Sequence, residues 1–237
     1  MAADVEWWAL AICLAVVALG AAVQGLIGMG MGMLAAPVLT LVEPDFLPVS
    51  MLIAVIPLSV GVARREWAHV QWRHALLALA GRLPGVVLGA WAATRTGDRF
   101  LSLVIGTSVL VAVLASVTGF RVRTTDTSLA IAGLTSGFTA TSAGTGGPPM
   151  AITYQHAEPR ALRATLAVFF TVGAAISLFA LVIAGEVGRV ELELSALVLP
   201  AVGAGFLASR PLLGRVPDRL IRSIVLAACT VAALTLI

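Results

Sequence analysis

The feature that most constrains this chain is a series of long apolar runs that carry almost no charged side chain. A helix needs about 20 apolar residues to cross a bilayer. Only 11% of the 237 residues are charged, against about 25% in soluble domains, and the mean hydropathy is +1.03. The runs lack the polar/apolar alternation of outer-membrane strands. The sequence therefore predicts an all-α integral membrane protein.

Charged residues and helix breakers divide the sequence into ten apolar runs. They are Trp7–Val23, Gly30–Val42, Leu47–Ala63, Ala75–Ala93, Phe100–Phe120, Leu129–Ala143, Pro149–Gln155, Ala164–Ala184, Leu194–Ser209 and Leu220–Ile237. The second and the seventh are too short to cross a bilayer. We expect about eight transmembrane helices plus broken or re-entrant segments, in which half-spanning helices return from a break at mid-membrane.

The segment QGLIGMGMGM, residues 24–33, places four glycines inside an apolar stretch. Each glycine costs about 1 kcal/mol relative to alanine in a helix interior. Gly28, Gly30 and Gly32 alternate with a period of two, which favours extended backbone over a helix. The segment therefore predicts a helix that breaks, followed by a short helix.

The second half of the chain contains a similar segment. A shift of 112 residues places Gly32 over Gly144 and Pro37 over Pro149, within SGFTATSAGTGGPP. Pro148 and Pro149 lack an amide donor, so a break is expected here too. Each half holds five runs, an odd number, so the second half enters from the opposite face. We predict two inverted-topology repeats, residues 1–120 and 121–237, within one transmembrane domain.

A short helix that begins at mid-membrane directs free amides and the positive end of its dipole toward the membrane interior. Two such ends from opposite faces form an anion site without basic side chains. The candidate substrate-binding residues are Gln24, Gly28, Gly30, Gly32, Pro37, Arg82, Thr141, Ser142, Gly144, Thr145, Gly146, Gly147 and Pro148. The alternative is that the glycines only permit close helix packing. If the glycines form the site, Gly146→Val should block transport, and the same change at Gly205, in a plain helix, should be milder. Equal transport by Gly146→Val and wild type would mean that the glycines are packing spacers.

Arg82 lies about seven residues inside the fourth run. An arginine at that depth costs from about 3 kcal/mol upward, which favours a functional role. Its side chain could instead snorkel to the membrane interface. The sequence leaves both interpretations open.

The sequence gives little support to metal binding, nucleic-acid binding or catalysis by histidine. Cys13 and Cys229 lie in separate runs without metal or redox spacing, so no metal or cofactor is expected. The arginines form no continuous basic face, which argues against nucleic-acid binding. His69, His74 and His156 lie near segment ends and are expected at the membrane interface rather than in catalysis.

The paired Gly-rich motifs, in two halves of about 110 residues, resemble the TauE/SafE sulfite exporter family, also called the toluene-sulfonate uptake permeases. SGFTATSAGTGGPP is the closer match, and QGLIGMGMGMLAAP has alternating Gly-Met in place of a glycine run. The resemblance implies a bacterial inner-membrane permease for sulfite, sulfonates or related organic anions. It also implies about eight spans, with site residues in the two motifs. The partners would be a small anion and the lipid bilayer, and a homodimer stays open.

Two rival functions differ in what they require. A passive anion channel would use the same site without coupling. A membrane phosphatase would need buried carboxylates beside a serine and an arginine, and none of the twelve acidic residues falls inside a run. The same absence leaves no clear residue for proton coupling.

The distribution of arginine among the connections predicts the orientation of the chain in the membrane. With connections assigned alternately to two faces, one face collects Arg64, Arg65, Arg73, Arg121, Arg123, Arg160, Arg163, Arg210, Arg215, Arg219 and Arg222. The other collects only Arg95, Arg99 and Arg189. The positive-inside rule places the first face in the cytoplasm and both termini outside.

Single cysteines test this orientation in a variant that lacks Cys13 and Cys229. Cysteines beside Arg65 and Arg215 should resist an impermeant thiol reagent in intact cells, because both loops are expected in the cytoplasm. Labelling of both loops would overturn the assignment.

Overall fold

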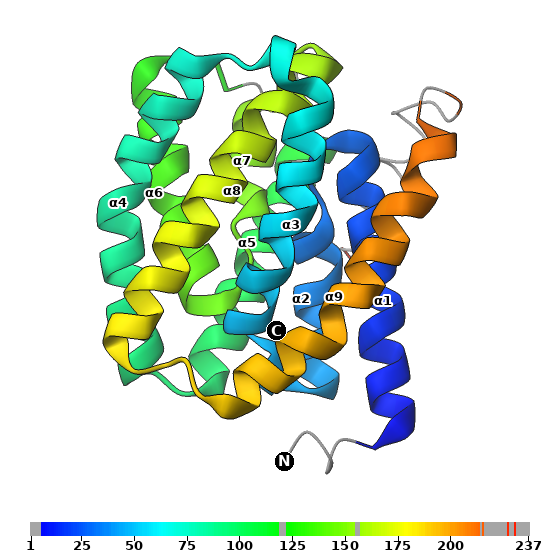
Figure 1. Cartoon of the computed structure of the whole chain (residues 1–237). Helices are drawn as coiled ribbons and strands as arrows, with labels where there is room; N and C mark the ends of the chain where they lie inside the picture. The colour runs from blue at the N-terminus through cyan, green and yellow to red at the C-terminus, as the bar shows by residue number, and fades with distance from the viewer. Residues whose placement is uncertain are drawn as a thin grey trace.

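The computed structural model describes residues 6–118, 122–154, 157–213, 215, 227 and 230. Within these residues the regular structure is entirely helical (Figure 1). The helices are α1 (Trp7–Ile27), α2 (Met31–Val42), α3 (Val49–Glu66), α4 (Trp72–Arg95), α5 (Asp98–Val117), α6 (Asp126–Ala143), α7 (Gly147–Tyr154), α8 (Pro159–Ala184) and α9 (Arg189–Ser209). Short 3-10 turns follow at Pro44–Phe46, Trp67–His69 and Arg210–Leu212.

In the described part of the chain, four helical segments are long and apolar enough to cross a membrane: Trp7–Ile27, Trp72–Arg95, Pro159–Ala184 and Arg189–Leu212. These segments support a multi-pass membrane protein, by length and composition. Exposed tryptophans stand near both ends, with Trp7 at one and Trp67 at the other, as in the aromatic belts of membrane proteins. Most of the tenth apolar run, Leu220–Ile237, lies outside the described residues.

The two short helices turn back along the helix that precedes each of them. A Cβ added to Gly20 would lie 3.0 Å from the Cα of Met31, so α2 starts beside the middle of α1. The hydroxyl of Thr124 donates to the carbonyl of Thr153 at 3.3 Å, which brings the end of α7 to the start of α6. With 12 and 8 residues, α2 and α7 are about 18 and 12 Å long. Both are half-length return helices, as the sequence predicts.

The remaining helices pass back and forth between two ends of the bundle (Figure 1). One end carries the connections from α3 to α4, α5 to α6 and α7 to α8. We call it the arginine-rich end, and it holds Arg64, Arg65, Arg73, Arg123, Arg160, Arg163 and Arg210. The opposite end holds Arg95, Arg99 and Arg189. The expected segregation of arginine is therefore present, and its sidedness in the membrane stays a prediction.

Helix α8 begins at the arginine-rich end with a well-formed cap. Pro159 occupies the first turn, where its missing amide costs nothing. The carboxylate of Glu158 accepts the amide of Ala161 at 2.8 Å. Hydrogen bonds from the amides of Ala161 and Arg160 lower the pKa of Glu158. These contacts fix where the longest helix enters the bundle.

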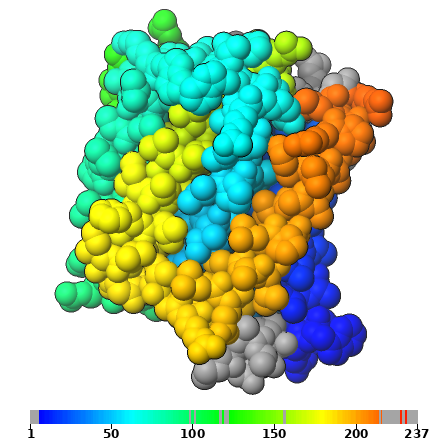
Figure 2. Space-filling model, viewed as in Figure 1, coloured from blue at the N-terminus to red at the C-terminus, as the bar shows by residue number. Residues whose placement is uncertain are grey.

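Helices from the two halves interleave as closely packed parallel pairs. A Cβ on Gly81 or Gly85 of α4 would overlap carbonyl oxygens of α6, and one on Gly205 of α9 would overlap the carbonyl oxygen of Ala18 in α1. Between these pairs, α3 and α8 pack antiparallel, and in Figure 2 their side chains fill the front of the molecule, with α9 alongside. Small residues of this kind let helix backbones approach in membranes.

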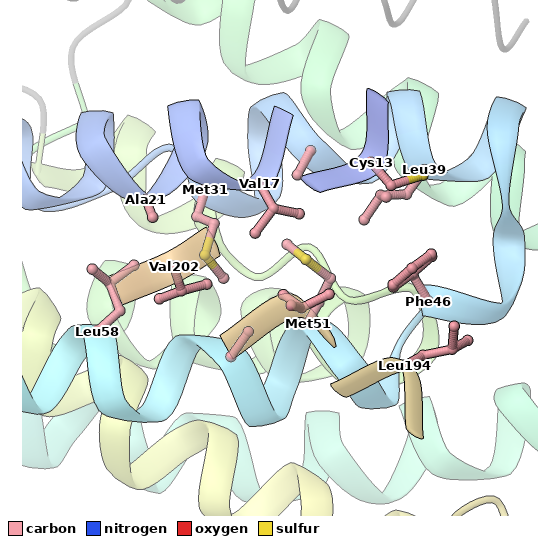
Figure 3. Packing of buried hydrophobic residues seen from close by; sticks show 13 residues of the cluster. Cys13, Val17, Ala21, Met31, Leu39, Phe46, Met51, Leu58, Leu194 and Val202 are labelled. Carbon is pink, nitrogen blue, oxygen red and sulfur yellow. The ribbon is translucent and has the colours of Figure 1, made fainter. Parts of the chain in front are cut away.

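The largest core cluster joins α1, α2, α3 and α9, as Figure 3 shows. Its members include Cys13, Val17, Met31, Met51 and Val202, all at most 3% exposed. Met31 belongs both to this core and to the first glycine-rich break. The break is therefore anchored in the core rather than placed on the lipid-facing surface.

Two expectations need correction. The residue at the end of α1 that corresponds to Gly144 at the end of α6 is Gly28, because both adopt left-handed backbone as C-caps. The 112-residue shift, which pairs Gly32 with Gly144, is therefore one helical turn out of register at the breaks. The expectation that a side chain at position 205 has a milder effect than one at position 146 is also wrong, because α1 leaves no space for a side chain at Gly205.

A matched pair of glycines in α9 tests the close packing. Gly205→Ala should lower the free energy of unfolding by about 2 kcal/mol or more, because the new methyl group overlaps backbone. Gly203 has nothing within 4 Å, so Gly203→Ala should be neutral or stabilise by up to about 1 kcal/mol. Thermal unfolding in detergent measures both, and equal melting temperatures would contradict this packing.

Candidate functional site

A small cavity lies where the two glycine-rich breaks meet. Its volume of about 40 Å³ is enough for a few water-sized positions. The lining residues are Gln24, Gly30, Met31, Gly32, Met51, Leu52, Val55, Arg82, Ala140, Gly144, Gly146, Gly147, Phe170 and Ala174. Residues from both halves, about 110 positions apart in sequence, thus share one cavity.

The first break depends on two glycines with positive φ. Gly28, at φ 86°, ends α1 and donates its amide to the carbonyl of Gln24 at 2.8 Å. Gly30, at φ 130°, precedes α2. L-residues with side chains rarely adopt such backbone. The side chain of Gln24 then accepts the amide of Met31 at 3.3 Å and donates to the hydroxyl of Ser59 at 3.2 Å.

The second break uses glycine followed by proline. Gly144, at φ 71°, ends α6 and donates to the carbonyl of Ala140 at 3.0 Å. The hydroxyl of Ser136 donates to the carbonyl of Gly146 at 2.6 Å. Helix α7 then begins at Gly147, and the two following prolines suit a first turn because the amides they lack would have no partner there.

The two breaks touch each other. A Cβ on Gly32 would lie 3.1 Å from the carbonyl oxygen of Gly144, and one on Gly147 would lie 3.4 Å from the Cγ of Met33. From this contact α2 runs toward the opposite end of the bundle and α7 toward the arginine-rich end. Both helices therefore present their N-terminal ends, each about half a positive charge, to the same region.

Arg82 lies near the middle of α4 and is 1% exposed. Its Nη1 donates to the hydroxyl of Ser136 at 3.2 Å, and its Nη2 to the hydroxyl of Ser177 at 3.1 Å. Its Cζ stands 5.0 Å from the ring centroid of Phe169, which allows a cation–π interaction. The snorkelling interpretation is wrong, because this side chain points into the bundle.

The charge of Arg82 has no counterpart. Among the described residues no carboxylate forms an ion pair with it, and its Nε is buried without a hydrogen-bond partner. Burying an isolated charge is costly unless an opposite charge joins it. The cavity therefore combines a buried cation, two helix N-termini and no buried acid, which is the environment that an anion requires.

The other predicted site residues divide into two groups. Thr141 supports the guanidinium indirectly, because its hydroxyl donates to Ser177 at 2.8 Å. The hydroxyl of Thr145 is buried without a partner, beside the meeting point of the breaks. Six candidates, these two threonines included, do not line the cavity: Gly28, Pro37, Thr141, Ser142, Thr145 and Pro148.

Four of these six residues have a local reason for lying elsewhere. Gly28 packs against the backbone of Arg163, and Pro37 lies inside α2, beyond its first turn. The hydroxyl of Ser142 donates to the carbonyl of Phe138 within its own helix. Pro148 faces a separate groove between α5, α6 and α7.

Sequence reasoning missed three serines. Ser59, Ser136 and Ser177 hold Gln24 and Arg82 in place and are at most 1% exposed. Ser136 could have been identified from the sequence, because it is the first residue of the second glycine-rich motif. Ser59 and Ser177 are single hydroxyls in apolar helices, and only the packing of α3 and α8 identifies their partners.

A buried carboxylate was missed as well. Glu66, the last residue of α3, is 7% exposed and pairs with Arg163 at 3.2 Å. Arg163 and Arg65 donate to the carbonyls of Leu26 and Gly25, in the last turn of α1. This cluster stabilises the helix end before the first break, and Glu66 does not line the cavity.

The family model described as Sulfite exporter TauE/SafE matches residues 12–236, nearly the whole chain. No curated protein and no solved structure matches.

Anion binding can be tested without transport. Sulfite should raise the melting temperature of the purified protein, because a ligand at 100 times its Kd stabilises the folded state by about 2.7 kcal/mol. Arg82→Met should melt higher than wild type without sulfite, since it removes an unpaired buried charge, and should lose the response to sulfite. A full response in Arg82→Met would contradict this site.

Proposed function

The chain belongs to the Sulfite exporter TauE/SafE family, and from that membership we propose that it is a permease moving small anions across the bacterial inner membrane. The proposed substrates are sulfite, sulfonates or related organic anions. The family is one of membrane transporters rather than enzymes, so the phosphatase alternative is set aside.

The observation that carries the proposal is the uncompensated charge of Arg82 in a cavity shared by both breaks. The guanidinium already donates to two serines, and its Nε is still unsatisfied. A small oxyanion at this place would neutralise the charge and accept hydrogen bonds from free amides at the helix N-termini. Gly32 and Gly147 would let its oxygens approach the backbone.

Apolar clusters on both sides of the cavity favour a gated permease over an open channel. Toward the arginine-rich end lie Met150, Leu166 and Phe169, all fully buried. Toward the opposite end lie Val49 and Leu181, equally buried. A charged solute crosses neither cluster unless the helices move, so we propose that the two sides open alternately.

The relation between the two halves supports this scheme. Each half contributes one long helix that ends at a left-handed glycine and one short helix that turns back. The pair α1 and α9 corresponds to the pair α6 and α4, with α3 and α8 packed between them. We infer two inverted-topology repeats, an arrangement in which rocking of one repeat against the other exposes a central site to each side.

Liposomes with a sulfite gradient test the proposed function. Wild type should carry sulfite, and Arg82→Gln should reduce the initial rate at least tenfold, with partial rescue by Arg82→Lys because charge matters more than fork geometry for a small anion. Gly146→Val should also abolish transport, since its side chain would overlap Ala140 and Ser136. Gly203→Val, in open space, is the matched control. Equal rates in wild type, Arg82→Gln and Gly146→Val would contradict the site.

A further inference from the structure

Several buried polar atoms of the described residues have no hydrogen-bond partner, and two of them belong to rings that pack against each other outside the central cavity. One is the phenolic oxygen of Tyr154, the last residue of α7, whose side chain is 1% exposed. The other is Nδ1 of His74, in the first turn of α4. The two rings stand edge to face, with centroids 6.1 Å apart and an interplanar angle of 69°. Buried polar groups normally find a partner, so this pair requires an explanation.

The pair lies in line with the central cavity. On α4, His74, Ala78 and Arg82 follow one another at intervals of four residues, so they form a single row along the helix. At 1.5 Å per residue, His74 lies about 12 Å from Arg82 toward the arginine-rich end. On α7, Gly147 lines the cavity and Tyr154 follows two turns later on the same face.

Apolar side chains fill the space between the cavity and the pair. Ala78, Met150 and Phe169 belong with Tyr154 to one buried cluster. Met150 is fully buried and is unbranched and flexible, so it can change rotamer at low cost. The order along the two helices is therefore a polar cavity, a thin apolar barrier and a second polar position.

We propose that Tyr154 and His74 form a second anion station, at which a small oxyanion stops on its way between the central cavity and the arginine-rich end. This inference rests on the proposed function. The phenolic hydroxyl is a hydrogen-bond donor, and the imidazole supplies another through a ring N–H. The anion would satisfy the atoms that now lack partners, and Met150 would be the barrier between the two stations.

The charges around the station fit an anion on this route. Arg73, adjacent to His74, is exposed at the arginine-rich end and pairs with Asp126 at 2.5 Å. Among the described residues, no charged side chain forms a salt bridge or hydrogen bond with Tyr154 or His74. An anion that leaves the station thus meets an arginine at the surface.

Tyr154→Phe distinguishes this role from a packing defect. If the hydroxyl is only an unsatisfied buried group, its removal should leave sulfite transport unchanged and raise the melting temperature. If it is part of the station, the initial rate should fall about tenfold, as for loss of one hydrogen bond to a charged group, while the melting temperature stays equal or rises. Slower transport by a more stable protein cannot come from misfolding.

Thr153→Val is the matched control. Thr153 precedes Tyr154 in the same turn and is also buried, but its hydroxyl donates to the carbonyl of Pro149. Its removal should leave the rate within twofold of wild type. His74→Leu should slow transport as Tyr154→Phe does, and the double variant should be no slower than either single variant, because both act at one station.

Sulfite-dependent thermal stabilisation separates this station from the central site. Tyr154→Phe should retain the full response, since the cavity and Arg82 are intact. A wild-type rate in Tyr154→Phe, or an equal loss in Thr153→Val, would overturn the station and leave the central site standing. A wild type that moves no sulfite would instead overturn the proposed function, and this station with it.

Discussion

The structure depends on one constraint: inside a bilayer, backbone amides and carbonyls must find partners within the protein. Two helix breaks inside the bundle interrupt the helical hydrogen bonding, and each break is supported by side chains. Gln24 accepts the first amide of α2, and Ser136 donates to the carbonyl before α7. The breaks also pack on each other, so each helps to support the other.

The same constraint explains why so much of the packing relies on glycine. Helices α4 and α6, and likewise α1 and α9, approach until their backbones are in contact, and this leaves room at the centre for only a small cavity. Gly173 continues the pattern, because a Cβ there would lie 2.5 Å from the Nε of Arg82. The glycines thus serve packing in most places, and we propose that a few of them admit an anion. The two interpretations of the glycine-rich segments apply to different residues.

Much of the fold could be predicted because membrane depth leaves few choices. Runs of apolar residues gave the long helices, and the glycine and proline positions gave the two half-length returns. The predicted alignment of the two glycine-rich segments was wrong by one helical turn. It matched Gly32 to Gly144, whereas the glycine that shares the left-handed backbone of Gly144 is Gly28. The inward direction of the Arg82 side chain and the burial of Glu66 could not be predicted from spacing, because both depend on which helix face meets a neighbour. The contact between Ser177 and Arg82 could not be predicted for the same reason.

The central claim is that an anion binds between the two breaks, beside Arg82. The most direct measurement is a structure of the protein with selenite, which resembles sulfite and scatters X-rays more strongly at selenium. The account predicts one selenium peak in the central cavity, with an oxyanion within hydrogen-bond distance of the Arg82 guanidinium and of backbone amides at Gly32 and Gly147. An empty cavity, with selenium bound only at the surface arginines, would contradict it.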